Sequence, residues 1–286
     1  MIVSIIGIGN VGKAMFSLLL HHPSISQINI MDPSEYQEGT ILDMIHMQAL
    51  LTDKSILVND EEAFSQSDYH FHCAGIQNKI GESRLSILEK NAELCETIFG
   101  NKNLKETSRI IVISNPLDII THYTIKASQL PAQQVIGTGT LLDASRLNHY
   151  LGYKDLKAWV LGEHGDSQVA ITSNLDKETP TLDKAIEDTR LAARSIRKTQ
   201  DYTAFGVVEC AYKIFEQWES SSSETLPLSI QTNDYYNDLL KLDQSICISL
   251  PVALNKKGYD ILPWPFNQDE LEQLKSSAQL LAKLIS

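Results

Sequence analysis

The sequence predicts an α/β protein with two domains. The N-terminal half alternates apolar strand-like runs with segments of helical periodicity, which is typical of a doubly wound parallel sheet with helices on both faces. A glycine-rich turn lies between the first apolar run and the first helical segment, and the second half changes to an α+β pattern with an antiparallel sheet. A chain of 286 residues is long enough for both, and we expect domains at 1–138 and 139–286.

The expected strands of the N-terminal half are short runs rich in isoleucine, valine and aromatic residues. They are 2–6, 28–31, 54–58, 69–73, 109–114 and 135–137, with an acidic turn between the third and the fourth. The expected helices are 13–20, 34–47 with Ser34 as N-cap, 85–99, and a helix that has Pro116 at its N1 position. Parallel strands place their carboxyl ends along one edge of the sheet, and ligands bind outside that edge.

The C-terminal half carries longer helical segments and two strands that can pair in an antiparallel sheet. We expect helices at 141–151, 182–198 and 203–218, and strands at 157–161, 226–231 and 245–254. A serine-rich tract at 220–223 is expected to be a mobile connection. Asn267 and Glu270 have the spacing of a capping box, so a final amphipathic helix should begin there.

Composition disfavours several classes of protein. The chain has 36 acidic and 24 basic residues, a net charge of −12, which disfavours nucleic acid or an anionic membrane as partner. No apolar run approaches the length of a membrane span, and the N-terminus lacks the basic start of a signal peptide. The four cysteines show no metal-ligand spacing, so we expect small buried apolar side chains, no metal site and a cytoplasmic protein.

Residues 2–32 have the pattern of a β-α-β unit of the Rossmann type. Gly7 suits a tight turn, Gly9 lets the backbone approach a pyrophosphate, and Gly12 lets the helix pack closely on the strand. Asp32 ends the second strand, where a carboxylate can bond the ribose hydroxyls and would repel a 2′-phosphate, so NAD is favoured over NADP. The expected NAD-binding residues are Gly7, Gly9, Asn10, Val11, Gly12, Asp32, Ala74, Gly75, Ser114, Asn115 and Thr138.

Several further motifs occur with this glycine turn in one order along the chain. They are a loop arginine at Arg84, Ser114-Asn115-Pro116, Leu142-Asp143-Ala144-Ser145-Arg146 and Gly162-Glu163-His164-Gly165-Asp166-Ser167. The set resembles the L-lactate/malate dehydrogenase family from residue 2 to about 286, and the last motif is the most specific. The resemblance implies an NAD-dependent L-2-hydroxyacid dehydrogenase that acts on a small 2-oxo or 2-hydroxy acid and forms a homodimer or homotetramer.

His164 is the natural proton carrier of this set, because the ordinary pKa of histidine lies near the working pH. A histidine taken alone is more often a structural or surface residue. The glycines on both sides of His164, in a motif that follows a strand, favour a role as general acid–base catalyst. Asp143 matches the family's carboxylate that orients the imidazole; otherwise it would be a helix-surface acid. Arg146 matches the clamp on the substrate carboxylate, and a simple ion pair with Asp143 is the alternative.

Three other residues complete the site that the resemblance implies. Arg84 matches the loop arginine that closes over the substrate and polarises the reacting carbonyl. Asn115 matches the residue that hydrogen-bonds the substrate near the nicotinamide, and Thr203 matches a position beside the substrate. Without the resemblance, Arg84 would be interpreted as a surface charge and Asn115 as a turn residue.

The sequence departs from the family pattern where substrate and regulation are determined. The specificity position of the loop is Asn78, where the family has glutamine for lactate and arginine for malate. An amide brings no charge to a second carboxylate, so we expect L-lactate and pyruvate, with malate or a broader range of L-2-hydroxy acids as alternatives. Asn148 replaces an arginine with which effector-regulated relatives bind a sugar bisphosphate.

A catalytically silent NAD-binding protein is the alternative to an enzyme.

Overall fold

One large sheet and one two-stranded sheet form the framework of the molecule. The computed structural model describes residues 1–51, 53–76, 84–173, 175, 179–220 and 224–285. Its strands are β1 (Ile2–Ile6), β2 (Gln27–Met31), β3 (Ser55–Val58), β4 (Tyr69–His72), β5 (Arg109–Val112), β6 (Val135–Gly137), β7 (Trp159–Leu161), β8 (Val169–Ile171), β9 (Thr225–Gln231), β10 (Cys247–Asn255) and β11 (Gly258–Ile261). The large sheet has the order β11-β10-β9-β6-β5-β4-β1-β2-β3. Strands β1 to β6 pair in parallel, which confirms the predicted fold class.

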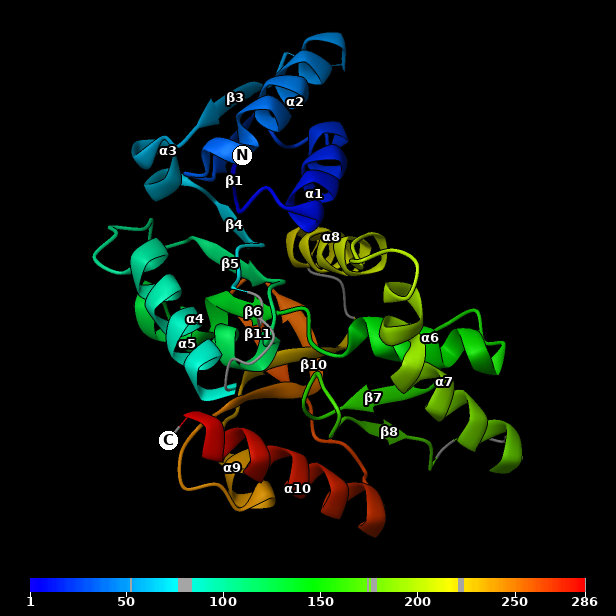
Figure 1. The fold of residues 1–286 in the computed structure, drawn as a ribbon. Coiled ribbons are helices and arrows are strands. Elements are labelled where there is room, and N and C mark those ends of the chain that lie inside the picture. Colours follow the sequence, from blue (N-terminus) through cyan, green and yellow to red (C-terminus); the bar gives the residue numbers. More distant parts are fainter. Residues whose placement is uncertain (52, 77–83, 174, 176–178, 221–223, 286) are drawn as a thin grey trace.

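Helices cover both faces of the parallel part of this sheet (Figure 1). The α-helices among the described residues are α1 (Asn10–His21), α2 (Glu38–Leu51), α3 (Glu61–Gln66), α4 (Arg84–Phe99), α5 (Leu117–Ser128), α6 (Leu141–Leu151), α7 (Thr179–Arg197), α8 (Phe205–Ser220), α9 (Asp234–Leu240) and α10 (Gln268–Ile285). Alternate residues of β5 face the two layers. Ile111 belongs to the core that contains α1 and α8, whereas Ile110 and Val112 belong to the core under α4 and α5.

The antiparallel strands of the C-terminal half extend the same sheet. Ser229 of β9 pairs with Gly137 of β6, and β10 and β11 follow in antiparallel order. The antiparallel pairing itself confirms the prediction, but its fusion to the parallel sheet was not predicted. The predicted capping box is also confirmed, because the N–H of Glu270 donates to Oδ1 of Asn267 at 2.8 Å and the N–H of Asn267 donates to Oε2 of Glu270 at 3.1 Å.

Several local predictions are wrong. The acidic turn between β3 and β4 is the helix α3, capped by Asp60, whose Oδ1 accepts the N–H of Ala63 at 2.7 Å. Pro116 is the N-cap of α5 and not its N1 residue, because the helix begins one residue later. Ser34 precedes a 3-10 turn, Glu35–Gln37, and makes no side-chain cap bond. The elements β8, β11 and α9 were not predicted, and most of the serine tract lies outside the described residues.

The cysteines and the helix lengths bear on the composition argument. Cys95, Cys210 and Cys247 are buried, Cys73 is half-buried, and all four are free, which fits small apolar side chains. Within the part of the chain that the structure describes, no helix is both long and apolar enough to cross a membrane.

Candidate functional site

The glycine turn after β1 needs two of its three glycines for its shape. Gly7 has a φ of +86°, and a Cβ there would lie 2.8 Å from the Cα of Ala74. A Cβ on Gly12 would overlap the carbonyl oxygen of Gly7, so glycine allows α1 to pack this closely. Gly9, the N-cap of α1, has no atom within 4 Å of its Cβ position. Open backbone at a helix N-terminus suits a pyrophosphate.

Asp32 follows the end of β2 beside this turn. Its Oδ2 accepts the backbone N–H of Ile8 at 2.7 Å, and its Oδ1 accepts the N–H of Ser34 at 3.0 Å. The carboxylate is therefore held against the glycine turn, which is where a dinucleotide places a ribose. Asn10 and Val11 form the first turn of α1, with Asn10 exposed to solvent.

The strands β4, β5 and β6 end along one edge of the sheet. Gly75 follows β4, Ser114 follows β5 and Thr138 follows β6. The segments after β4 and β5 run close together, because a Cβ on Gly75 would lie 3.2 Å from the Cβ of Ser114. The topology therefore brings the predicted residues of this edge to one place, as the strand order requires. They are Ala74, Gly75, Ser114, Asn115 and Thr138.

A cavity of about 450 Å³ lies at this edge. Residues from α6, α7 and α8 of the C-terminal half form its other walls. Predicted site residues from both halves of the chain line it, so one cavity combines nucleotide-edge and C-terminal residues. They are Val11, Asn115, Thr138, Asp143, Arg146, His164 and Thr203.

His164, Asp143 and Arg146 form one hydrogen-bonded group in the cavity wall. Oδ2 of Asp143 lies 2.8 Å from Nδ1 of His164, and Oδ1 of Asp143 accepts a bond from Nη1 of Arg146 at 3.1 Å. The Asp143 side chain is only 6% exposed, whereas that of His164 is 25% exposed. The carboxylate thus holds both cationic side chains from the buried side and leaves them accessible from the cavity.

Burial and pairing act in opposite directions on this group. Burial alone would lower the pKa of His164, but the Asp143 carboxylate outweighs it and the pKa is raised. For Asp143, burial would raise the pKa, but His164 and Arg146 together outweigh it and the pKa is lowered. The site therefore favours an imidazolium beside an ionised carboxylate, which is the loaded form of a proton donor.

The structure describes the other predicted residues to different extents. Arg84 is the first residue of α4, but its side chain lies outside the described part, as does the whole of Asn78. Thr203 lines the cavity just before α8. Asn148 is buried, and its Nδ2 donates to the carbonyl oxygen of Ala158 at 2.6 Å, so its side chain serves the packing of α6.

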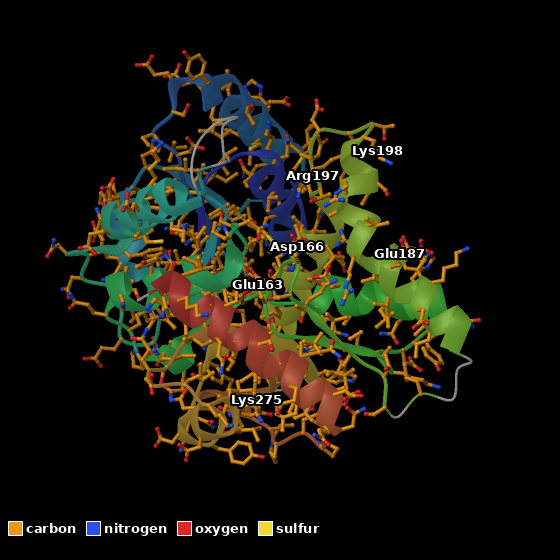
Figure 2. The ribbon with its side chains drawn as sticks, turned by 60° about the horizontal axis from the view of Figure 1, so that its bottom comes forward. Glu163, Asp166, Glu187, Arg197, Lys198 and Lys275 are labelled. Atoms are coloured by element: carbon orange, nitrogen blue, oxygen red, sulfur yellow. The ribbon has the colours of Figure 1, made fainter. Side chains whose placement is uncertain are left out.

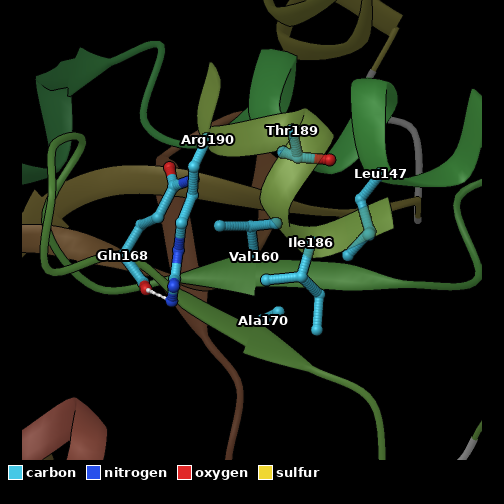
Figure 3. Close-up of a pocket in the computed structure, with 7 residues that line it drawn as sticks. All are labelled: Leu147, Val160, Gln168, Ala170, Ile186, Thr189 and Arg190. Carbon is cyan, nitrogen blue, oxygen red and sulfur yellow. Dashed lines mark hydrogen bonds between the residues drawn. The ribbon is translucent and has the colours of Figure 1, made fainter. Parts of the chain in front are cut away.

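Sequence reasoning missed a row of arginines on α7. Arg190, Arg194 and Arg197 line the same cavity, and their i, i+4, i+7 spacing on one helix face was the signal that could have found them. Nη2 of Arg190 lies 3.4 Å from the carbonyl oxygen of Gln168, beside a cavity of about 10 Å³ (Figure 3). Among the described residues, no carboxylate pairs with Arg194 or Arg197.

One contact of the site, unlike the arginine row, had no signal in the sequence. Asp118, buried at the start of α5, accepts the backbone N–H of His164 at 2.8 Å across 46 residues of chain.

Within the described ranges, no three His, Cys, Asp or Glu side chains gather in a way that could hold a metal ion.

Comparison with known proteins gives two family matches that together span nearly the whole chain. The lactate/malate dehydrogenase NAD binding domain matches residues 1–137, and the lactate/malate dehydrogenase alpha/beta C-terminal domain matches residues 140–286. An L-lactate dehydrogenase of Synechococcus sp. (strain JA-3-3Ab) is 29% identical over 303 residues, covering 99% of this chain and 97% of the relative.

Two solved structures are similar over their whole lengths. MGS-M5, a lactate dehydrogenase from a Medee basin deep-sea metagenome library, has a TM-score of 0.88 and 27% identity, covering 99% of this chain and 97% of that one. The malate dehydrogenase from Archaeoglobus fulgidus in complex with NADH has a TM-score of 0.87 and 27% identity, covering 100% of this chain and 98% of that one.

Proposed function

This chain belongs to the lactate/malate dehydrogenase family and is an NAD-dependent 2-hydroxyacid dehydrogenase, and we propose that it interconverts pyruvate and L-lactate. The observation that carries the proposal is the hydrogen-bonded group of Asp143, His164 and Arg146 in the wall of the cavity at the sheet edge. A silent NAD-binding protein would need the first domain alone. It would have no use for a carboxylate that orients both a proton carrier and an arginine.

Each side chain of the group has a task in this reaction. When bound, the cofactor would supply the hydride to the substrate carbon as NADH and accept it from that carbon as NAD⁺. With Nδ1 held by Asp143, Nε2 of His164 donates a proton to the carbonyl oxygen in reduction and removes it in oxidation. The fork of Arg146 grips the two oxygens of the substrate carboxylate. Arg84 polarises the reacting carbonyl, with Asn115 and Thr203 beside the substrate.

We assign the cofactor to the edge that β1, β2, β4, β5 and β6 share. The open backbone at Gly9 and the N-terminus of α1 suit the pyrophosphate, and Asp32 suits a ribose without a 2′-phosphate. The proposed division between the nucleotide domain and the catalytic domain is 138/139, between β6 and α6. The other proposed NAD-binding residues are Gly7, Asn10, Val11, Gly12, Ala74, Gly75, Ser114, Asn115 and Thr138.

The choice of pyruvate depends on the loop position Asn78. Its amide carries no charge, so this position offers nothing to balance a second carboxylate in a closed site. An unpaired buried carboxylate costs several kcal/mol, which favours a substrate with one carboxylate. Asparagine is also shorter than glutamine by one methylene, so slightly larger acids such as 2-oxobutyrate should be accepted.

A second candidate function, the reduction of oxaloacetate to malate, has one observation in its favour. Arg194 and Arg197 line the cavity, and no described carboxylate pairs with them. Guanidinium groups at this spacing repel one another, and an anionic group between them would remove that repulsion. A second carboxylate could therefore be bound by α7, although Asn78 at the specificity position of the loop is uncharged.

One experiment separates the two candidates. We would measure kcat/KM for pyruvate, 2-oxobutyrate and oxaloacetate in the wild type and in Arg194→Gln/Arg197→Gln. Lys198→Gln is the control, because it removes a positive charge from the exposed residue that follows α7 and does not line the cavity (Figure 2). If pyruvate is preferred and the oxaloacetate-to-pyruvate ratio is the same in all three proteins, the lactate assignment stands. An oxaloacetate preference that falls tenfold or more only in the double variant would establish the second candidate.

We also propose that the protein is a cytoplasmic homodimer or homotetramer. On α2, Leu42 is 54% exposed and Leu50 is 88% exposed, and a subunit interface would cover such side chains. Light scattering coupled to size exclusion measures the assembly, and Leu50→Glu should weaken it. A monomer at the concentrations of the activity assay would contradict the proposal.

A further inference from the structure

Asp118 is a buried carboxylate that contacts the main chain of the histidine loop. It is the second residue of α5 and is only 3% exposed. Its Oδ2 accepts the backbone N–H of His164 at 2.8 Å, and its Oδ1 accepts the hydroxyl of Ser229 on β9 at 2.6 Å. Both oxygens are therefore used within the protein, and Asp118 does not line the cavity.

Among the described residues, other elements hold the main chain of Gly162-Glu163-His164 at three points. Gly162 exchanges two backbone hydrogen bonds with Ser249 of β10, at 3.0 and 3.1 Å. The N–H of Glu163 donates to the hydroxyl of Ser277 on α10 at 2.9 Å. The third point is Asp118. The first two points use only neutral groups, so holding this loop in place does not by itself require a charge.

The charge of Asp118 needs its own explanation, because it is unfavourable for folding. Burial raises the pKa of Asp118 to about 6, although the Ser229 hydroxyl and the His164 amide act against it. The other titratable groups near the carboxylate are Glu163 and the buried thiol of Cys247. Among the described groups that act on the pKa of Asp118, His164 is the one that can carry a positive charge.

Three charged groups act on His164. Asp143 contacts its ring and Asp118 contacts its backbone, and both favour the imidazolium, whereas Arg146 disfavours it. We propose that Asp118 is a positioning residue that fixes the main chain at His164 and, through its charge, keeps the imidazole protonated as the reductive reaction requires. This inference rests on the proposed role of His164 as proton carrier.

Asp118→Asn tests the proposal because it removes the charge and keeps the contacts. The Asn oxygen can accept the His164 N–H, and its NH₂ group can donate to the Ser229 hydroxyl. In the pH profile of reductive kcat/KM, the upper limb is the fall in activity as pH rises through the pKa of His164. In Asp118→Asn we expect this upper limb to lie at lower pH by roughly 0.5–1 unit. Asp234→Asn, an exposed acid on α9, is the matched control and should leave the limb in place.

A second readout and a second variant keep the test decisive. The imidazole proton signal of His164 can be titrated by NMR without substrate, and its midpoint should shift in the same direction. Ser229→Ala removes the hydroxyl that donates to Asp118, so the Asp118 carboxylate takes up a proton at higher pH than in the wild type. The upper limb of the pH profile should then also move to lower pH, but by less than in Asp118→Asn. A profile and an NMR midpoint that stay unchanged in Asp118→Asn would overturn the inference. Wild-type turnover in His164→Gln would instead overturn the proposed function.

Discussion

Oδ2 of Asp143 and Nδ1 of His164 lie 2.8 Å apart, and this contact determines which ring nitrogen of His164 is left without a partner from Asp143. When Nδ1 carries the proton that bonds to the carboxylate, Nε2 is the nitrogen that exchanges protons. The buried acid and the quarter-exposed ring place that exchange on the cavity side. The geometry therefore links one measurable activity, proton transfer during reduction, to two side chains.

Replacing His164 by Gln removes the proposed proton carrier. We expect kcat for pyruvate reduction to fall by about 10²–10⁴, because general acid catalysis is lost, while NADH binding is retained. Steady-state turnover and NADH fluorescence titration measure the two effects separately. His149→Gln, which changes an exposed histidine on α6, is the control. Near-normal turnover in the His164 variant would contradict its assigned role.

Replacing Asp143 by Asn should slow reduction and also change its pH dependence. The Asn amide can donate to Nδ1, which selects the wrong tautomer of His164. The substitution also removes the largest cause that raises the pKa of His164. Because reduction needs the imidazolium, activity should be lost at lower pH than in the wild type. A pH profile of kcat/KM whose upper limb does not move would argue against the pairing.

Much of the N-terminal fold could be predicted because its signals are local. The β-α-β unit that begins at Ile2 is specified by residues within one short segment, and the parallel strands follow from their alternation with helices. The pairing of Gly137 with Ser229 could not be predicted, since it joins residues 92 positions apart and leaves no trace in either segment's periodicity. The helix α3 was not predicted because its 6 residues are too few to show a helical repeat of apolar side chains.

The site was predictable to the extent that its residues lie in motifs. His164, Asp143 and Arg146 stand in such motifs, and the structure brings them into contact. Asp118 follows a turn proline, where an acid at a helix start has an ordinary explanation, so nothing local indicated its bond to His164. The charges on α7 had the spacing of an exposed helix face, and only the fold turns that face toward the cavity.

Asp32 should make NADH the preferred cofactor by at least tenfold, about 1.4 kcal/mol. The bond from the Ile8 amide holds its carboxylate where a 2′-phosphate would meet a like charge. Asp32→Ser removes that charge and should lower the ratio of kcat/KM with NADH to kcat/KM with NADPH. Asp43→Ser, an exposed acid on α2, is the control. Equal use of both cofactors by the wild type would refute the assignment.

Arg146→Lys keeps the positive charge but loses the planar fork. A lysine ammonium can bond one carboxylate oxygen well but cannot copy the paired geometry of a guanidinium. Oxamate, a mimic of pyruvate, should bind the NADH complex of this variant at least tenfold more weakly, about 1.4 kcal/mol. NADH affinity should be unchanged and serves as the internal control. If oxamate binds equally well, Arg146 is not the clamp.

Asp118→Asn should make the fold more stable at neutral pH. The ordinary pKa of this carboxyl is 3.8, and burial raises it to about 6 in the folded protein. The native state therefore holds the proton more tightly than the unfolded chain, so the wild type loses stability as pH rises from about 4 to about 6 and no more above that. The Asn variant has no such loss, because it keeps both hydrogen bonds without a charge.

The size of this gain follows from the same shift. Two pKa units correspond to about 3 kcal/mol as an upper bound, and we expect about 1–2 kcal/mol at about pH 7 after allowance for relaxation. Scanning calorimetry of the wild type and Asp118→Asn should show a higher Tm for the variant at neutral pH and no difference near pH 4. A variant less stable than the wild type at neutral pH would mean that the carboxylate stabilises the fold. The variant could instead be more stable and lose its reductive activity, as pH rises, at a lower pH than the wild type. That result would mean that the Asp118 charge favours the imidazolium of His164 and destabilises the fold.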